Sequence, residues 1–132
     1  MQLVRLFYVS EILAPISAVD VQVILGASQI RNRRLDVTGM LAQSDRHFAQ
    51  VLEGRREAVD EVMARISRDS RHASVRVLLE ESITRRQFAH WAMGLIRRDD
   101  LADELQRWHR DDCTGGATAA REMIRRLYPA QA

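Results

Sequence analysis

The sequence has almost no cysteine and no long apolar run. Cys113 is its single cysteine among 132 residues, so an intrachain disulfide or a paired-thiol redox or zinc motif cannot form. The adjacent carboxylates of Asp111 and Asp112 disfavour its thiolate, and we expect no reactive nucleophile there. No segment reaches the roughly 18 consecutive apolar residues that span a bilayer, and the first residues lack the apolar core of a secretory signal. We therefore expect a cytoplasmic protein with no membrane association.

Lysine is missing altogether. All 20 basic residues are arginine, against 18 acidic residues, which gives a net charge of +2. Acidic residues are interspersed among the short arginine clusters, so no segment shows the excess of one sign that follows a phosphate backbone. Aromatic residues make up only 5% of the chain, which disfavours the base-stacking surface of an RNA-binding sheet. The composition is that of a globular domain and does not indicate a nucleic-acid partner.

Motifs of the common catalytic sites are also missing. The four histidines show neither HxxxH nor HExxH spacing, so we expect no metal site. The sequence contains no GxSxG nucleophile motif and no GxxxxGK phosphate loop. We therefore do not expect an enzyme with a catalytic centre of its own.

Strand-like and helix-like segments alternate along the first hundred residues. Ser17 and Asp20 form a capping-box pattern that begins a helix ending near residue 30. A second helix has apolar residues at i, i+3, i+4 and i+7 counted from Val59. The predicted strands are residues 2–9, 37–42, 47–53, 75–79 and 91–96, of which the second and third form a hairpin. The order β-α-β-β-α-β-β predicts an α+β, ferredoxin-like sheet with two helices on one face.

Residues 98–132 offer a cover for the other face of that sheet. Residues 101–108 predict a short helix, and a second helix follows Gly115 and Gly116. The apolar stripe of this last helix can pack on the sheet or on a partner protein, and both alternatives stay open. We divide the chain into a domain over residues 1–97 and a C-terminal helical cap over residues 98–132. The stripe consists of Ala120, Met123, Ile124 and Leu127.

Two polar residues occupy positions that the strand pattern marks as internal. Gln50 lies on the same side of its strand as Phe48 and Leu52. Tyr8 lies near the end of the first strand. A buried amide without a partner costs roughly 1–3 kcal/mol, so we expect Gln50 to be hydrogen-bonded. Tyr8 and Gln50 can satisfy each other, and their position alone implies no further role.

Both residues lie in segments that resemble, in order, the signatures of the BLUF family of blue-light sensors using FAD. The segments are residues 4–10, 32–41, 48–54, 65–72 and 88–94. The resemblance covers about residues 2–97. It implies a ferredoxin-like domain that binds FAD non-covalently, with the isoalloxazine ring between the two helices.

The resemblance also implies a role for each unusual residue. Tyr8 is similar to the family's electron and proton donor to the excited flavin, and Gln50 to the amide that bridges this tyrosine and the flavin. On the second helix, Asp69 lies four residues after Arg65 and can orient its guanidinium toward the flavin. The other residues implied in cofactor binding are Ile24, Ser28, Arg31, Asn32, Ile66, Arg71 and His72. The residues implied in signal relay are Ser10, Trp91 and Met93.

The resemblance implies a photoreceptor that passes its signal to a separate effector, because residues 98–132 are too few for a cyclase or phosphodiesterase domain. We expect that effector to be a cyclic-dinucleotide enzyme or a transcription regulator, and we expect the chain to form homo-oligomers. Two alternatives stay open: a ferredoxin-like module that binds RNA or a small regulatory ligand, and a flavin-dependent redox enzyme. A flavin spectrum of the purified protein excludes an RNA-binding module, and a reversible spectral change in light excludes a simple redox enzyme.

Overall fold

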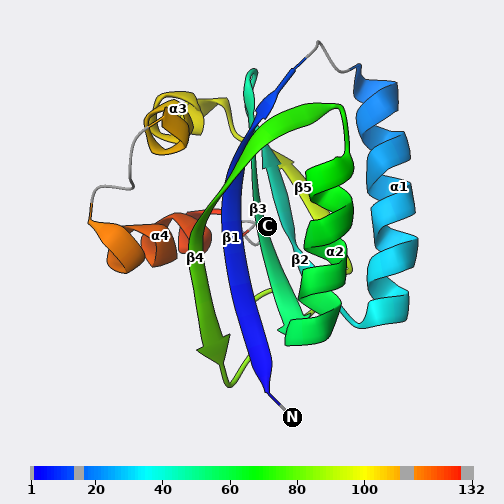
Figure 1. The fold of residues 1–132 in the computed structure, drawn as a ribbon. Coiled ribbons are helices and arrows are strands. Elements are labelled where there is room, and N and C mark those ends of the chain that lie inside the picture. Colours follow the sequence, from blue (N-terminus) through cyan, green and yellow to red (C-terminus); the bar gives the residue numbers. More distant parts are fainter. Residues whose placement is uncertain (1, 14–16, 111–114, 129–132) are drawn as a thin grey trace.

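The fold of the chain is organised around one five-stranded sheet (Figure 1). A computed structural model describes residues 2–13, 17–110 and 115–128. The elements are β1 (Leu3–Ile12), α1 (Ala18–Leu35), β2 (Thr38–Gln43), β3 (His47–Arg55), α2 (Arg56–Arg68), β4 (His72–Ile83), β5 (Gly94–Arg97), the 3-10 turn η1 (Asp99–Leu101), α3 (Ala102–Arg110) and α4 (Gly116–Arg126). The strand order is β4-β1-β3-β2-β5, with β2 and β5 parallel and the other neighbours antiparallel. The predicted α+β, ferredoxin-like architecture is confirmed.

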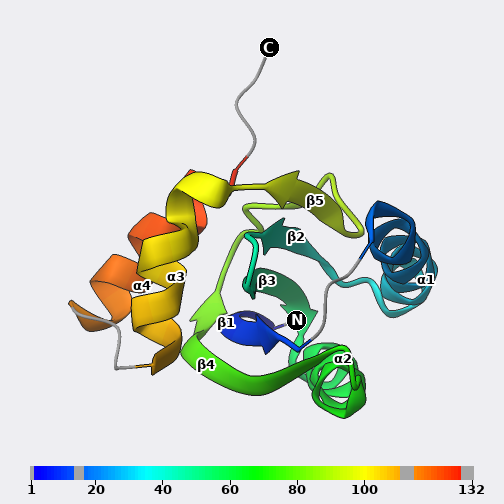
Figure 2. The ribbon, with the colours of Figure 1, turned by 90° about the horizontal axis from the view of Figure 1, so that it is seen from above.

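Helices cover both faces of the sheet (Figure 2). Helices α1 and α2 lie on one side and α3 and α4 on the other. Successive residues of β1 alternate between the two sides, so that Leu6 and Tyr8 pack toward α1 and α2 while Phe7 and Val9 pack toward α3 and α4. Every residue of β3 except Arg55 is buried. Within the described residues, no helix is long and apolar enough to cross a bilayer.

The apolar stripe of α4 packs on the sheet. Its residues share one hydrophobic cluster with Phe7, Met40 and Val51 of the sheet. The sequence left open whether this stripe packs on the sheet or on a partner protein, and the structure shows that it packs on the sheet. The division at residue 98 stays a prediction, and the helices after that point share a core with the sheet before it. The four stripe residues, each at most 1% exposed, are Ala120, Met123, Ile124 and Leu127.

The predicted boundaries of α1 are correct at its start and wrong at its end. Ser17 accepts a hydrogen bond from the backbone N–H of Asp20 (3.1 Å), and the Asp20 carboxylate accepts one from the backbone N–H of Ser17 (3.4 Å), which completes the capping box. The helix continues past residue 30 to Leu35 and ends at Asp36, whose φ of 55° is left-handed. Its last turn contains Arg33 and Arg34, whose positive charge is favourable at a helix C-terminus.

The last predicted strand is shorter than expected. We predicted a strand over residues 91–96, but β5 begins at Gly94, and Trp91 and Met93 precede it. The carbonyl oxygens of Ala92 and Met93 accept hydrogen bonds from α1 side chains, from Asn32 Nδ2 (2.9 Å) and from Gln29 Nε2 (3.0 Å) respectively. These contacts take the carbonyls away from strand pairing. The 88–93 segment is therefore a loop held by α1.

His47 lies where α3 packs against the hairpin of β2 and β3. Its side chain is buried, and its ring centroid is 5.2 Å from that of His109 in α3. Burial, together with the His109 ring and Arg46, lowers the pKa of His47, and Glu11 opposes this shift in part. His109 Nε2 in turn lies 2.8 Å from the carbonyl oxygen of Ser74. The imidazole of His47 therefore favours its neutral form in the folded chain.

We predict that His47 makes the fold sensitive to acid. Below a pH of about 6.5 the unfolded chain binds a proton at His47 that the folded chain resists, so the free energy of unfolding falls by at most about 1.4 kcal/mol per pH unit. The substitution His47→Gln should flatten this decline between pH 7 and pH 5, as measured by urea unfolding. The exposed His90 is the control, and His90→Gln should leave the slope unchanged. Equal slopes for His47→Gln and the unmodified chain would contradict the prediction.

Candidate functional site

Tyr8 and Gln50 face each other across the centre of the sheet. They are register partners in the antiparallel pair of β1 and β3, and both side chains are almost wholly buried on the side of α1 and α2. The Tyr8 hydroxyl donates a hydrogen bond to Gln50 Oε1. Gln50 Nε2 donates a second one to the sulfur of Met93 (3.0 Å). The predicted pairing is confirmed, and it continues into the loop before β5.

The environment of Tyr8 keeps its hydroxyl protonated. Burial, with a smaller contribution from the negative charge of Asp69, raises the pKa of the Tyr8 phenol well above its ordinary value of 10.0. At neutral pH this group is therefore a neutral hydrogen-bond donor, and Gln50 is its acceptor.

Asn32 has a buried oxygen atom without a partner. Its side chain is 1% exposed, and Nδ2 donates to the carbonyl of Ala92 (2.9 Å). Its Oδ1 has no hydrogen-bond partner among the described residues. A buried acceptor left unpaired costs about 1–3 kcal/mol. Because Asn32 lines a pocket, this oxygen can accept a hydrogen bond from a ligand N–H placed there.

That pocket lies against the sheet beside α1 and α2 and contains every residue that the sequence implied in cofactor binding. Its lining also includes four residues that the sequence analysis did not assign to the site. Phe48 could have been found from its shared parity with Gln50, and Leu41 is the register partner of Gln50 on β2. The predicted lining residues are Tyr8, Ile24, Ser28, Arg31, Asn32, Gln50, Arg65, Ile66, Asp69, Arg71 and His72, and the unpredicted ones are Ala27, Leu41, Phe48 and Val62.

Three guanidinium groups and one carboxylate line the pocket. Asp69 accepts from the backbone N–H of Arg71 (2.9 Å) and forms an ion pair with its guanidinium (3.3 Å). Helix spacing had predicted that Asp69 orients Arg65, but Asp69 lies just beyond the last helical residue, where a turn brings Arg71 to it instead. Burial and the like charge of Arg65 lower the pKa of Arg31. The pocket therefore has a positively charged side that suits an anionic or carbonyl-bearing ligand.

His72 connects three elements beside Tyr8. Its Nδ1 lies 2.7 Å from the hydroxyl of Ser10 in β1, and its Nε2 lies 2.9 Å from the carbonyl oxygen of Ile66 near the end of α2. The ring centroid is 6.5 Å from that of Tyr8 and 6.1 Å from that of Phe48. Both ring nitrogens already contact protein groups, so the imidazole contributes to the pocket only as part of its lining.

Met93 and Trp91 lie on opposite sides of the loop that contains them. Met93 is buried in the cluster beneath α1 and α2, where it contacts Gln50. Trp91 packs against the cluster of α3 and α4, with its ring 5.2 Å from Tyr128 and 6.4 Å from Phe88. Of Trp91 and Met93, it is therefore Met93 that contacts the site in this structure, through Gln50.

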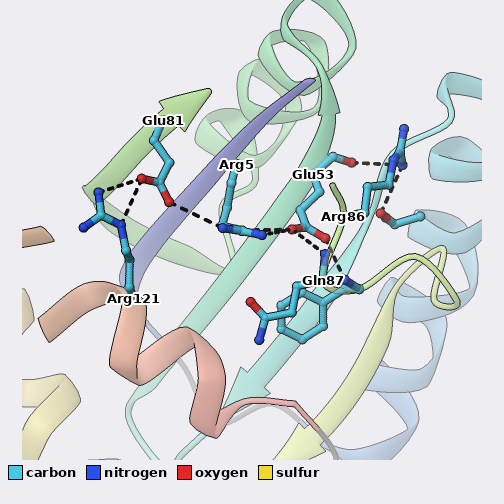
Figure 3. A network of polar contacts seen from close by, with 8 residues as sticks. Arg5, Glu53, Glu81, Arg86, Gln87 and Arg121 are labelled. Atoms are coloured by element: carbon cyan, nitrogen blue, oxygen red, sulfur yellow. Dashed lines mark hydrogen bonds and ion pairs between the residues drawn. The ribbon is translucent and has the colours of Figure 1, made fainter. Parts of the chain in front are cut away.

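A buried carboxylate that the sequence analysis did not single out fixes the start of this loop (Figure 3). Glu53 is fully buried on β3, and it accepts hydrogen bonds from the backbone N–H groups of Gln87 (3.0 Å) and Phe88 (2.7 Å). Arg5 of β1 forms an ion pair with it (2.8 Å). Arg86 donates to the backbone carbonyl of Glu53 (3.3 Å). Both carboxylate oxygens are thus satisfied, as a buried charge requires.

The same network reaches helix α4 (Figure 3). Arg5 lies between Glu53 and Glu81, and its guanidinium is 3.4 Å from the Glu81 carboxylate. Arg121 of α4 contacts Glu81 on β4 at 2.8 Å. Hydrogen bonds and positive charges from Arg121 and Arg5 lower the pKa of Glu81. The loop before β5 and the helix α4 are therefore connected through alternating charges across the sheet.

The fold and the pocket together define a ligand-binding domain whose site lies between a ferredoxin-like sheet and two helices. Residues 3–94 match the family described as sensors of blue-light using FAD, or BLUF. The chain therefore belongs to the BLUF family, whose cofactor is FAD. Among the described residues, no group of three His, Cys, Asp or Glu side chains could hold a metal ion.

Proteins similar to this chain include light sensors of several kinds. The alpha subunit of a photoactivated adenylate cyclase from Euglena gracilis is 35% identical over 76% of this chain and 10% of its own length. The blue light- and temperature-regulated antirepressor BluF of Escherichia coli is 37% identical over 58% of this chain and 19% of its own length. The dark-state structure of the BLUF protein BlrB has a TM-score of 0.79 and 35% identity, covering 94% of this chain and 93% of that one. The chain thus spans about a tenth of the cyclase subunit and nearly all of BlrB.

We predict that Glu53 stabilises the chain through its position beneath the loop. The substitution Glu53→Gln should lower the free energy of unfolding by about 1.5–3 kcal/mol, because Arg5 and two backbone N–H groups lose a charged acceptor. Urea unfolding measures the loss. The control is Glu80→Gln, since Glu80 pairs with Arg56 on the surface, where an ion pair contributes about 1 kcal/mol or less. Equal losses in the two variants would contradict the prediction.

Proposed function

We propose that this chain detects blue light by a hydrogen-bond switch at Tyr8 and Gln50 and passes the signal to a separate effector. The observation that carries the proposal is the buried chain of hydrogen bonds from Tyr8 through Gln50 to Met93, in which Tyr8 and Gln50 line the pocket. A single side chain, that of Gln50, joins the photochemical donor to the loop before β5. A change at Tyr8 is therefore communicated to Met93 by one amide group.

The residues of the pocket fit a flavin. The unpaired Oδ1 of Asn32 is suited to accept from a ring N–H, and Ile24 and Ile66 offer apolar surface to an aromatic ring. Arg65 and Arg31 supply donors for ring carbonyl or phosphate oxygens. Bound FAD supplies the absorption of blue light and, once excited, the capacity to take up an electron.

Tyr8 and Gln50 have complementary roles in this switch. Tyr8 has a hydroxyl that is protonated in the dark and can give up its proton together with an electron. Gln50 presents its oxygen to Tyr8 and its NH2 group to Met93. Since an amide contains one acceptor and two donors, a reversal of its orientation exchanges what it offers on the two sides. Met93 then loses its donor, which releases one contact of the loop.

In this proposal the chain passes its signal to a separate effector protein. The names of its relatives point to adenylate cyclases and an antirepressor, and one similar structure is described as a complex with cyclic di-GMP. We propose a cyclic-dinucleotide enzyme or a transcription regulator as the effector, and no catalytic role for the chain itself. The contacts of the 86–93 segment with Glu53, and through Arg5 and Glu81 with α4, support an output from the α4 side.

We predict that the light response depends on both residues of the switch. Blue light should give a small red shift of the flavin absorption that reverses in the dark without lasting reduction. The substitution Tyr8→Phe removes the hydroxyl and Gln50→Leu the amide, so both variants should bind FAD and lose the shift. Absorption spectra before and after illumination measure it. A normal light-adapted spectrum in either variant would contradict the switch, and lasting photoreduction of the unmodified chain would favour a redox enzyme.

A second prediction concerns the retention of the cofactor. Asn32→Ala should weaken FAD binding by about tenfold or more, because the ring loses a buried acceptor worth at least about 1.4 kcal/mol. Fluorescence titration of the apoprotein with FAD measures this. The matched control is Gln29→Ala, since Gln29 is also an amide of α1 that bonds the same loop, through Met93 O, but does not line the pocket. Equal affinities of the two variants would remove Asn32 from the site.

A further inference from the structure

The outer side of α1 presents large apolar side chains to solvent. Among the described residues, the exposed large hydrophobic side chains are Leu13, Val19, Val23, Ile30 and Val77. Three of these belong to α1, where Val19 is 72%, Val23 62% and Ile30 63% exposed. Scattered exposed aliphatic residues are common on protein surfaces. Three on one helix of this size form a pattern that needs an explanation.

These three residues lie in one line along the helix. With Gly26 they occupy positions i, i+4, i+7 and i+11, the alternating spacing of four and three residues that forms a coiled-coil seam. At 100° per residue, this line lies on the side of α1 opposite its buried residues Val21 and Asn32. Helix α1 thus presents an apolar line to solvent on the side that faces away from the sheet. An exposed apolar line of this kind often marks a contact with another protein.

Nothing within the described chain covers this line, and α1 lies at the margin of the molecule (Figure 2). We propose that a second copy of this chain covers it, with the α1 helices of the two copies packed antiparallel along the seam of Val19, Val23, Gly26 and Ile30. This inference goes beyond the proposed light response and does not depend on it.

The charges beside the seam favour an antiparallel second copy. Asp20 and Arg34 lie on the same flank of the seam, at opposite ends of α1. In antiparallel coiled coils, equivalent flanks of the two helices face each other. Asp20 of each copy then lies beside Arg34 of the other, so that two pairs of unlike charge form at once. A parallel arrangement would bring the same ends together and would place like charges near one another.

The side chains that face each other across the seam in an antiparallel pair are also complementary in size. In the antiparallel register, Val19 lies opposite Ile30 of the second copy, and Val23 lies opposite its Gly26. A Cβ placed at Gly26 would have no atom within 4 Å in the single chain, so the helix surface is open there, and the missing side chain allows a close approach of Val23. The contact is isologous, as a twofold dimer requires. The seam extends over about 17 Å of helix, so we expect a dimer that dissociates on dilution.

The test is the oligomeric state of the purified, FAD-loaded chain in the dark, measured by sedimentation at several protein concentrations. The unmodified chain should show a monomer–dimer equilibrium. The substitutions Val23→Gln and Ile30→Gln keep a residue that favours helix and remove the apolar seam, so each should raise the dimer dissociation constant about tenfold or more. The control is Val77→Gln, an exposed valine on β4, which should leave it unchanged.

A second pair of variants tests the register. Arg34→Asp should weaken the dimer because two carboxylates would then face each other, and the effect should shrink at high salt. Arg85→Asp makes the same change in net charge at an exposed position outside α1 and should have no effect. Circular dichroism and bound-flavin absorbance confirm that each variant is folded.

Three results would overturn the proposal. They are a chain that stays monomeric at several hundred micromolar, a dimer that the seam variants leave intact, and equal effects of the Arg34 and Arg85 variants. The oligomeric state is measured in the dark, so these results do not depend on whether the chain responds to light. A monomeric chain whose seam binds another protein would also count against the second copy.

Discussion

The central constraint on this molecule is that β3 is buried on both faces, so that every polar group on it needs a partner within the protein or in the pocket. Besides His47 at its start, two buried polar side chains are placed there, three residues apart, and the alternation of a strand directs these two to opposite faces. Gln50 points to the side of α1 and α2, where Tyr8 and Met93 bind it. Glu53 lies on the other side, where Arg5 and the backbone of Gln87 and Phe88 bind it.

The loop before β5 is shaped by these two groups. Its first residues are held by the carboxylate on one face of β3, and Met93 near its end contacts the amide on the other face. Helix α1 adds two further contacts, through Asn32 and Gln29, to the carbonyls of Ala92 and Met93. The loop is thus a junction of α1, β3 and β5. One of the contacts that hold this loop is the hydrogen bond from Gln50 to Met93. The orientation of a single amide therefore affects how firmly the loop is held.

The architecture could be predicted from the sequence because it depends on local patterns, whereas most of the pocket residues were implied only by the resemblance to the BLUF family. Strand alternation correctly predicted that Gln50 is buried, and Ser17 with Asp20 correctly predicted the start of α1. The 91–93 segment could not be assigned in this way, because Asn32 and Gln29, about sixty residues away in the sequence, bind the carbonyls of Ala92 and Met93. The pairing of Asp69 with Arg71 depends on a turn after α2, which helical spacing does not describe.

Glu53 shows a different limit of the sequence analysis. A carboxylate at the end of a strand is ordinarily solvated, and only the loop that returns across β3 explains why this one is buried. The prediction that Cys113 is unreactive concerns a position outside the described residues. The roles of the pocket residues likewise stay predictions, although the structure places all of them around one cavity.

The position of the aromatic residues gives this domain two separate optical reporters. Both tryptophans of the chain, Trp91 and Trp108, belong to the cluster between the sheet and helices α3 and α4. The pocket on the opposite face contains no tryptophan among its lining residues. Intrinsic tryptophan emission therefore samples the packing of the helical cover, while visible absorbance samples the flavin side. Events on the two faces of one sheet can accordingly be timed against each other in a single unlabelled sample.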